Sequence, residues 1–153
     1  MTVLKRIPKV LSPRLLHVLA SMGHGDEIVL ADANFPAASI ASHTPGGLVN
    51  ADGNDIPTLL DAIMQLLPLD ETAPPAMVMG MMPEHTAAGW KTPIWDEYKK
   101  ILAHAEGRDI ALEGIERFAF YARSKQAFAV VATGETALYG NLILKKGVIG
   151  TSK

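Results

Sequence analysis

The strongest constraint on the fold is a set of four short, mostly apolar runs, separated by segments that contain charged residues, glycine and proline. They occupy residues 27–32, 76–81, 127–133 and 142–144. Runs of this length are typical of strands buried on both faces of a sheet, and each is far shorter than the ~20 apolar residues that a membrane-spanning helix requires. Segments with helical spacing alternate with them, so we predict an α/β fold whose apolar residues form a core or a subunit interface.

Three segments carry the spacing and the start signals of helices. Ser12 and Pro13 open a run of apolar residues at helical spacing, and this run ends at Gly23. Serine at the N-cap and proline at the first helical position are typical of a helix start. Residues 56–67 and 93–103 have the same spacing, each with a proline in its first turn. The sequence therefore predicts three helices of ordinary length.

The remaining segments are less regular. Residues 33–55 contain too many glycines and prolines for regular structure throughout, so we expect mostly loop with a short strand near Leu48. The β-forming side chains of residues 115–120 predict a further strand, followed by a short helix or turn over residues 121–125. No internal repeat or linker divides the chain, and we expect one domain over residues 1–153.

Charge and composition limit the partners of this chain. The formal net charge of -2 leaves no basic surface for phosphate backbones or anionic lipids, so we expect neither nucleic acid nor membrane as a partner. The absence of cysteine excludes disulfides and thiolate nucleophiles, and it favours a cytoplasmic location. The N-terminal residues are basic but lack a signal cleavage site. A small neutral ligand is the expected partner.

The sequence has no signature of a metal or nucleotide cofactor. It contains no H-E-x-x-H, G-x-G-x-x-G, G-x-x-x-x-G-K or G-x-S-x-G motif. Four of its histidines show no close metal-ligand spacing: His17, His43, His85 and His104. We therefore expect no metal site and no cofactor.

His24 is the first candidate for proton transfer. It stands between Gly23 and Gly25, where the chain passes from the first helix to the first strand. Glycines at such a turn permit positive φ and leave the imidazole unshielded, and the ordinary pKa of histidine suits proton transfer near neutral pH. The alternative is a histidine that caps the C-terminus of the helix.

Asp32 follows the first strand, where open α/β sheets bind ligands. Its carboxylate could accept hydrogen bonds from sugar hydroxyls or orient His24, or it could simply form an Asx turn before Pro36. Tyr139 and Asn141 precede the last strand and offer neutral groups that both donate and accept hydrogen bonds, as a polyol requires. The alternative for this pair is a hairpin turn.

Arg117 follows Glu116 directly and allows two interpretations. The guanidinium could clamp a ligand, or the two side chains could form an ordinary surface ion pair. The sequence pattern around them does not separate these alternatives.

Five phrases of the chain, taken in order, resemble the family of fucose mutarotases and ribose pyranases, most closely its fucose mutarotase branch. They are MGHGDEI at 22–28, ADANFP at 31–36, RFAFY at 117–121, AFAVVATGE at 127–135 and YGNLILKKG at 139–147. The resemblance implies a three-layer α/β/α fold with a mixed sheet. It also implies a ring-forming homo-oligomer, typically a decamer, with active sites at subunit boundaries.

The resemblance also implies roles for individual residues. His24 matches the proton donor of the family, and Asp70 matches a position that acts in catalysis. The residues that match sugar-contacting positions are Asp32, Met79, Arg117, Tyr139 and Asn141. The expected activity is the interconversion of α and β anomers of a monosaccharide such as L-fucose, by acid and base proton transfer through ring opening and without a cofactor.

Three alternatives remain open from the sequence. A ribose pyranase would use the same proton chemistry to interconvert pyranose and furanose rings. A non-catalytic sugar-binding protein would use Tyr139 and Asn141 without proton transfer. A purely structural ring-former would have no affinity for sugar.

Overall fold

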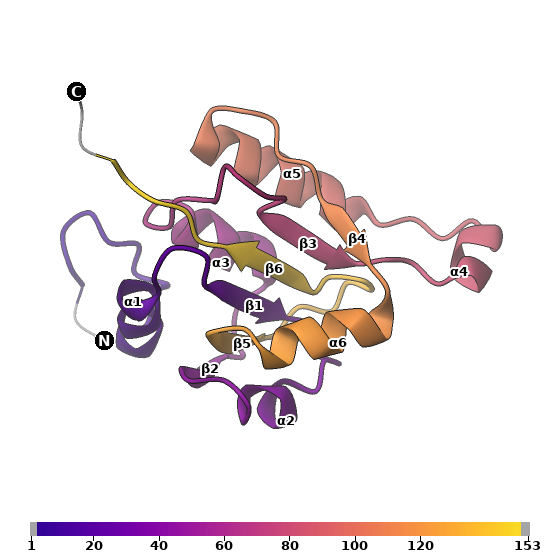
Figure 1. The fold of residues 1–153 in the computed structure, drawn as a ribbon, viewed down its shortest axis with the longest axis horizontal. Coiled ribbons are helices and arrows are strands. Elements are labelled where there is room, and N and C mark those ends of the chain that lie inside the picture. The colour runs from indigo at the N-terminus through magenta and orange to yellow at the C-terminus, as the bar shows by residue number, and fades with distance from the viewer. Residues whose placement is uncertain (1–2, 151–153) are drawn as a thin grey trace.

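The strand Glu27–Ala31 (β1) lies at the centre of a six-stranded sheet. It pairs in parallel with Ala129–Thr133 (β5) on one side and antiparallel with Leu142–Lys145 (β6) on the other. The computed structural model, which describes residues 3–150, thus places apolar runs from both ends of the chain side by side (Figure 1). Because β1 has a neighbour on each side and helices on both faces, four of its five residues are buried, as its apolar sequence predicts.

The sheet is mixed, and its strand order is β2-β5-β1-β6-β3-β4. β6 runs antiparallel to its two neighbours, whereas the other strands run parallel to β1. The strands not yet defined are β2 (Gly47–Ala51), β3 (Ala76–Met79) and β4 (Glu113–Ile115). The mixed sheet confirms the expectation from the family resemblance.

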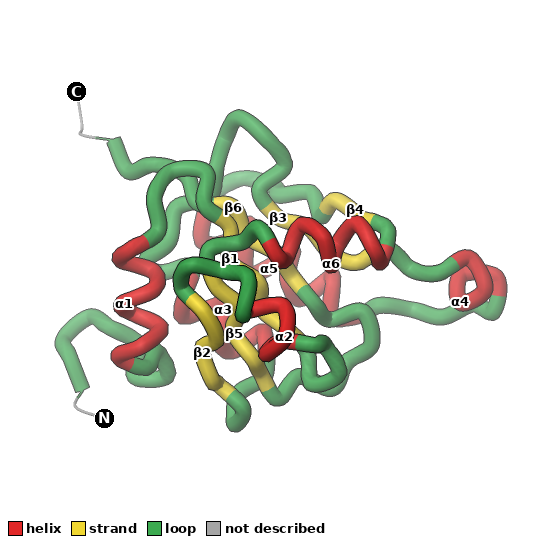
Figure 2. The backbone as a smooth tube through the Cα atoms, turned by 60° about the horizontal axis from the view of Figure 1, so that its bottom comes forward, coloured by secondary structure: helices red, strands yellow, loops and turns green. Residues whose placement is uncertain are grey.

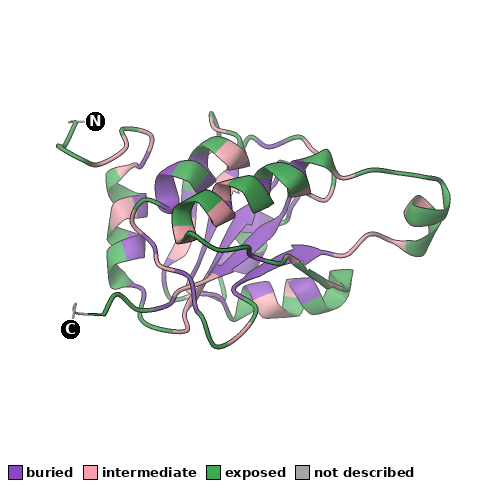
Figure 3. Ribbon diagram, turned by 90° about the horizontal axis from the view of Figure 1, so that it is seen from above, coloured by how far each residue is buried: buried purple, intermediate pink, exposed green. Residues whose placement is uncertain are grey.

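Helices cover both faces of the sheet and make three layers (Figure 2). One face packs against α1, α3 and α5, and the other packs against α2 and α6. Figure 3 shows the buried strands between these two helical layers. The helices are α1 (Pro13–Ser21), α2 (Ala37–Ala41), α3 (Ile56–Ile63), α4 (Pro83–Ala87), α5 (Pro93–Glu106) and α6 (Arg117–Lys125). The predicted α/β/α architecture is confirmed.

The three predicted helices are present, with shifted ends. Ser12 caps α1 by accepting a hydrogen bond from the Leu15 amide at 3.1 Å, with Pro13 in the first turn. α3 is shorter than residues 56–67, because the chain leaves helical pairing after Ile63 and continues in tighter turns. α5 extends three residues beyond the predicted end and stops at Gly107, whose φ of 69° is left-handed.

The strand predicted over residues 115–120 is wrong, since β4 ends at Ile115 and α6 begins at Arg117. The Glu116 carboxylate caps this helix by accepting a hydrogen bond from the Ala119 amide at 3.0 Å. Phe120 and Ser124, four positions apart, are the buried side chains of α6. Their helical spacing prevails over the β propensity of the segment.

The segment 33–55 holds the strand expected near Leu48, which is β2. It also holds α2, a short helix that its breaker content did not predict. Further along the chain, α4 lies on an arm that projects from the body of the molecule, and none of its residues is buried (Figure 1). Over the described part of the chain, no helix is long and apolar enough to cross a membrane.

Gly147 gives a prediction that links the fold to the segment containing Asp70. Its amide donates to the Pro68 carbonyl at 2.8 Å, and a Cβ at this position would overlap the Leu69 carbonyl and lie 2.9 Å from the Asp70 amide nitrogen. We expect Gly147→Ala to lower the free energy of unfolding by about 1–3 kcal/mol, because rigid backbone must move to admit the methyl group. Urea denaturation measures this loss.

The matched control is Gly53→Ala, because a Cβ there meets no atom within 4 Å. Its unfolding midpoint should stay close to that of the unmodified protein. Equal midpoints for the two alanine variants would show that the contact beside Gly147 is not tight.

Candidate active site

The predicted site residues divide between two opposite edges of the sheet. We call the edge where β1, β3, β4 and β5 end and β6 begins the carboxyl edge, and the opposite one the amino edge. His24 and Asp70 lie at the amino edge, whereas Asp32 follows the end of β1. Five strand residues separate the two edges along β1, a distance of about 16 Å. The proposed orientation of His24 by Asp32 therefore cannot occur within one chain.

His24 lies at an exposed turn that joins α1 to β1. The turn is closed by the Asp26 carboxylate, which accepts from the Gly23 amide at 2.7 Å, and Gly25 has a φ of 86°. The Gly25 amide donates to the Lys146 carbonyl at 2.9 Å, which ties the turn to the end of β6. The imidazole is 55% exposed. Because Met22 is the C-cap of α1, the interpretation of His24 as the helix cap is wrong.

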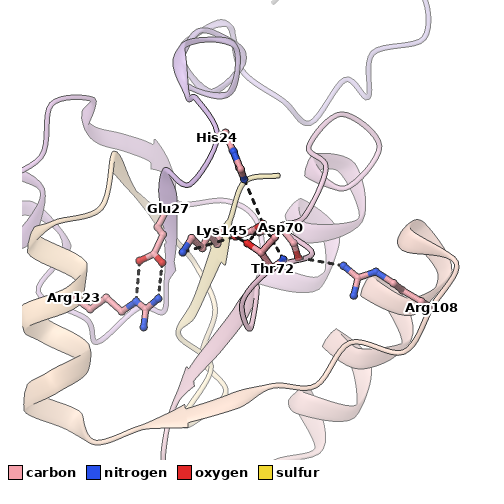
Figure 4. Close-up of polar contacts among 7 residues, drawn as sticks. All are labelled: His24, Glu27, Asp70, Thr72, Arg108, Arg123 and Lys145. Carbon is pink, nitrogen blue, oxygen red and sulfur yellow. Dashed lines mark hydrogen bonds and ion pairs between the residues drawn. The ribbon is translucent and has the colours of Figure 1, made fainter. Parts of the chain in front are cut away.

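Asp70 is the carboxylate that His24 contacts (Figure 4). The Nε2 atom of His24 lies 3.4 Å from Oδ1 of Asp70. The carboxylate also accepts hydrogen bonds from the Thr72 amide at 3.2 Å and the Thr72 hydroxyl at 3.1 Å, and Lys145 Nζ lies 3.8 Å from its other oxygen. The Asp70 side chain is only 4% exposed, and its contact orients the exposed imidazole of His24.

The contacts of Asp70 favour its ionised form. The Thr72 backbone amide, followed by the Thr72 hydroxyl and His24, lowers the pKa of Asp70 below the ordinary value of 3.8. At neutral pH this group is therefore a carboxylate that can accept a proton or orient His24. It is not a proton donor.

The carboxyl edge holds a cavity of about 330 Å³. All five residues predicted to contact sugar line it: Asp32, Met79, Arg117, Tyr139 and Asn141. Its walls are completed by Asn34, Phe35, Gly80, Met82, His85, Trp90, Tyr121 and Leu138. A cavity that combines charged and neutral polar groups with apolar surface matches a monosaccharide, which has a hydroxyl-rich rim and an apolar ring face.

Asp32 and Asn141 are joined across the central strands. The Oδ1 atom of Asn141 accepts a hydrogen bond from the Asp32 backbone amide at 2.7 Å. The Oδ1 atom of Asp32 accepts a hydrogen bond from the Asn34 amide at 3.0 Å, so the Asx turn that the sequence offered as an alternative is present. The Asx turn does not exclude a contact with a ligand, because Asp32 also lines the cavity.

Burial raises the pKa of the Asp32 carboxyl above 3.8, and the charge of Glu135 adds to this effect. The folded state therefore binds the Asp32 proton more tightly than the unfolded state, and the stability contributed by this group falls as pH rises from 3.8 through the raised pKa. We expect Asp32→Asn to raise the free energy of unfolding at pH 7 relative to the unmodified protein. Urea denaturation at a series of pH values measures the difference.

The same substitution should weaken sugar binding, because it removes a charged acceptor from the cavity. The gain in stability should shrink as pH falls through the raised pKa and disappear below 3.8, where the carboxyl is protonated in both states. A variant less stable at pH 7 than the unmodified protein would contradict the account of Asp32.

Tyr139 has a strained backbone that several contacts hold in place. Its φ of 60° is left-handed, which is uncommon for a bulky residue. The indole nitrogen of Trp95 donates to the Tyr139 carbonyl at 2.8 Å, and the buried Tyr98 hydroxyl donates to the Gly140 carbonyl at 2.6 Å. The interpretation of this segment as a hairpin turn is wrong, because β6 pairs with β1 and β3 and not with β5. These contacts hold Tyr139 at the cavity despite the strain of its backbone.

Arg117 is the first residue of α6 and lines the cavity. Its guanidinium lies 4.7 Å from the centre of the Phe118 ring. The Glu116 carboxylate caps the start of α6. Capping is therefore the structural role of Glu116, in place of the surface ion pair. The cation of Arg117 can therefore face a ligand.

The sequence did not single out several residues that line the cavity. His85 and Trp90, on the arm that carries α4, stack with parallel rings at a centroid distance of 3.6 Å. Phe35 and Tyr121 also line the cavity, and the centres of their rings are 5.6 Å apart. The phrases ADANFP and RFAFY already contained the last two residues, but only the fold brings them together. Among the described residues, no three histidine, aspartate or glutamate side chains form a group that could hold a metal ion.

A family model described as the RbsD / FucU transport protein family matches residues 5–149. The chain belongs to this family. RbsD/FucU relatives named fucose mutarotase include those of Homo sapiens, 59% identical over 150 residues, and Danio rerio, 58% identical over 149. Each alignment covers 97% of this chain and 96% of the relative.

A solved RbsD/FucU structure extends the comparison to three dimensions. The fucose mutarotase in complex with L-fucose from Streptococcus pneumoniae is 47% identical in sequence and superposes with a TM-score of 0.83. The superposition covers 96% of this chain and 100% of that one. The three-layer RbsD/FucU fold therefore extends across nearly the whole chain.

Proposed function

We propose that this chain is an L-fucose mutarotase, an isomerase that interconverts the α and β anomers of the free sugar. The observation that carries the proposal is the carboxyl-edge cavity, where Asp32, Arg117, Tyr139 and Asn141 surround a space of monosaccharide size. The relatives named fucose mutarotase support the choice of sugar.

The chemistry assigns separate tasks to the two edges. Anomer exchange needs a proton delivered to the ring oxygen and a proton removed from the anomeric hydroxyl, giving an open aldehyde that closes on either face. His24 is the proposed proton donor, because its imidazole is exposed and directed by the ionised Asp70. The carboxyl-edge groups hold the sugar hydroxyls, and the apolar walls, Met79 among them, contact its ring carbons and methyl group.

One chain alone does not complete this site, because His24 lies at the opposite edge of the sheet from the cavity. We propose that the amino edge of one subunit meets the carboxyl edge of the next. Exposed apolar side chains at both edges support such a contact: Phe118 and Leu138 beside the cavity are 65% and 55% exposed, and Val148 after β6 is 67% exposed.

A contact between two different edges is head-to-tail, and repeated head-to-tail contacts form a ring when the rotation between neighbouring subunits closes. We propose a ring-forming homo-oligomer, a decamer by resemblance to the family, and a cytoplasmic location in keeping with the absence of cysteine. Sedimentation velocity measures the assembly. A monomer at enzyme concentrations that show activity would contradict the shared site.

Exchange spectroscopy tests the activity directly. Saturation transfer between the α and β anomeric protons of L-fucose should increase with protein concentration. D-ribose in parallel distinguishes the pyranase alternative, which predicts faster pyranose and furanose exchange in that sugar. Sugar-dependent shifts in the protein spectrum without any acceleration of exchange would contradict the enzyme and favour a binding protein.

A further inference from the structure

We infer that His85 is a positioning residue that sets the hydrogen-bond direction of the Tyr139 hydroxyl, so that this oxygen faces the sugar as an acceptor. The contact joins the exposed arm of α4 to the loop before β6, across 54 positions of the sequence. The consequence for the sugar rests on the proposed function, whereas the hydrogen bond between the two side chains does not.

The Tyr139 oxygen has two neighbours within the protein. The Met82 backbone amide donates to it at 3.1 Å, and Nδ1 of His85 lies 2.5 Å away. The oxygen therefore already accepts one hydrogen bond, from Met82, and among the described protein atoms Nδ1 of His85 is the acceptor that its own hydrogen can reach. This assigns the Tyr139 hydroxyl as donor and Nδ1 as acceptor. The remaining hydrogen of the neutral ring then resides on Nε2.

Trp90 holds the imidazole in the plane that this bond requires. The two rings are stacked at 3.6 Å with an angle of 3° between them, and the Trp90 amide donates to the His85 carbonyl at 3.0 Å. The tyrosine ring meets the imidazole edge-on at 5.7 Å. A planar partner on one side and an edge on the other leave His85 little freedom to turn Nδ1 away.

The direction of this bond decides what the cavity offers to a sugar. Because the only hydroxyl hydrogen of Tyr139 is directed to Nδ1, the lone pair left on the oxygen accepts a hydrogen bond. Tyr139 thus selects a sugar hydroxyl that donates at that point. Without His85, the phenol hydrogen is free to enter the cavity and oppose that hydroxyl.

The imidazole resonances test the bond itself, with the full chain and without sugar. Long-range proton–nitrogen NMR of the labelled protein distinguishes Nδ1 from Nε2, and His85→Phe identifies the signals. We expect Nδ1 without a covalent hydrogen, and a clear displacement of its resonance in Tyr139→Phe, where the donor is lost. A protonated Nδ1, or a resonance unchanged by Tyr139→Phe, would overturn the inference.

A double-mutant cycle tests the consequence. His85→Phe keeps a ring to stack on Trp90. We expect it to raise the KM for L-fucose about three- to tenfold, because one ordinary hydrogen bond is lost, and to change kcat less. In the Tyr139→Phe background the same change should have no further effect. Glu84→Gln, the neighbouring exposed position on α4, is the matched control and should leave KM unchanged.

Independent effects of the two substitutions would show that His85 supports only the arm, and they would overturn the inference. If the unmodified protein accelerates no anomer exchange, the proposed function fails. The cycle is then measured as sugar affinity from chemical-shift titration, and the Nδ1 resonance still decides the hydrogen bond.

Discussion

His24→Ala should reduce anomer exchange of L-fucose by about 10² to 10⁴-fold, the range that one positioned acid or base contributes. Imidazole is the side chain that most often serves as a general acid or base near neutral pH. Its exposure of 55% means that the substitution removes few packing contacts. Saturation-transfer NMR across the fucose concentration range measures the loss.

The control for His24→Ala is His104→Ala, an exposed histidine near the end of α5. This variant should retain full exchange activity, and both variants should unfold at similar urea concentrations. Full activity of a folded His24→Ala variant would remove His24 from the mechanism.

Asp70→Asn should produce the second large loss, a fall in exchange of the order of 10²-fold. Asparagine keeps an oxygen to accept from Thr72, but it has no negative charge to direct and stabilise the protonated His24. The measurement is the same exchange experiment. Glu71→Gln, at the neighbouring exposed position, is the control and should retain activity.

Stability gives an independent check on Asp70. Because its folded pKa lies below 3.8, the ionised carboxylate stabilises the folded state above 3.8, and this contribution is lost as pH falls through the lowered pKa. Asp70→Asn should therefore be less stable than the unmodified protein at pH 7, and the difference should disappear in strong acid. A difference that is the same at every pH would point to packing and not to charge.

The sequence predicted the sheet well because its strands are buried on both faces. A short apolar run such as residues 27–32 is typical of a strand at the centre of a sheet, and β1 occupies that run almost as predicted. The helix start at Ser12 was equally clear, since a capping side chain and a proline act locally. The strand predicted over residues 115–120 was wrong because Glu116 caps a helix that starts at Arg117, and β propensity does not indicate a helix cap.

The candidate site was predicted only in part. Motif resemblance pointed to five of the residues that line the cavity. The spacing of eight positions from His24 to Asp32 suggested that the two side chains are close, whereas the strand holds them apart. The pairing of His24 with Asp70 depends on the contact of Asp70 with the end of β6, 75 positions further along the chain, which local sequence does not encode. His85 and Trp90 stood outside every recognised phrase, so only the structure brings them to the cavity.

The account depends on a site completed by two subunits, and mixed assemblies test this. His24→Ala chains keep an intact carboxyl edge, whereas Arg117→Ala chains keep an intact amino edge. Each protein is assayed alone, and equal amounts are then unfolded and refolded together. Random head-to-tail assembly makes about one quarter of the boundaries join two intact edges.

Refolding the two inactive variants together should therefore restore exchange of L-fucose to about a quarter of the activity of the unmodified protein. Saturation-transfer NMR of the refolded mixture gives this value directly. A mixture no more active than the separately refolded variants would contradict the shared site, and with it the transfer of a proton from the amino edge of one chain to a sugar held by its neighbour.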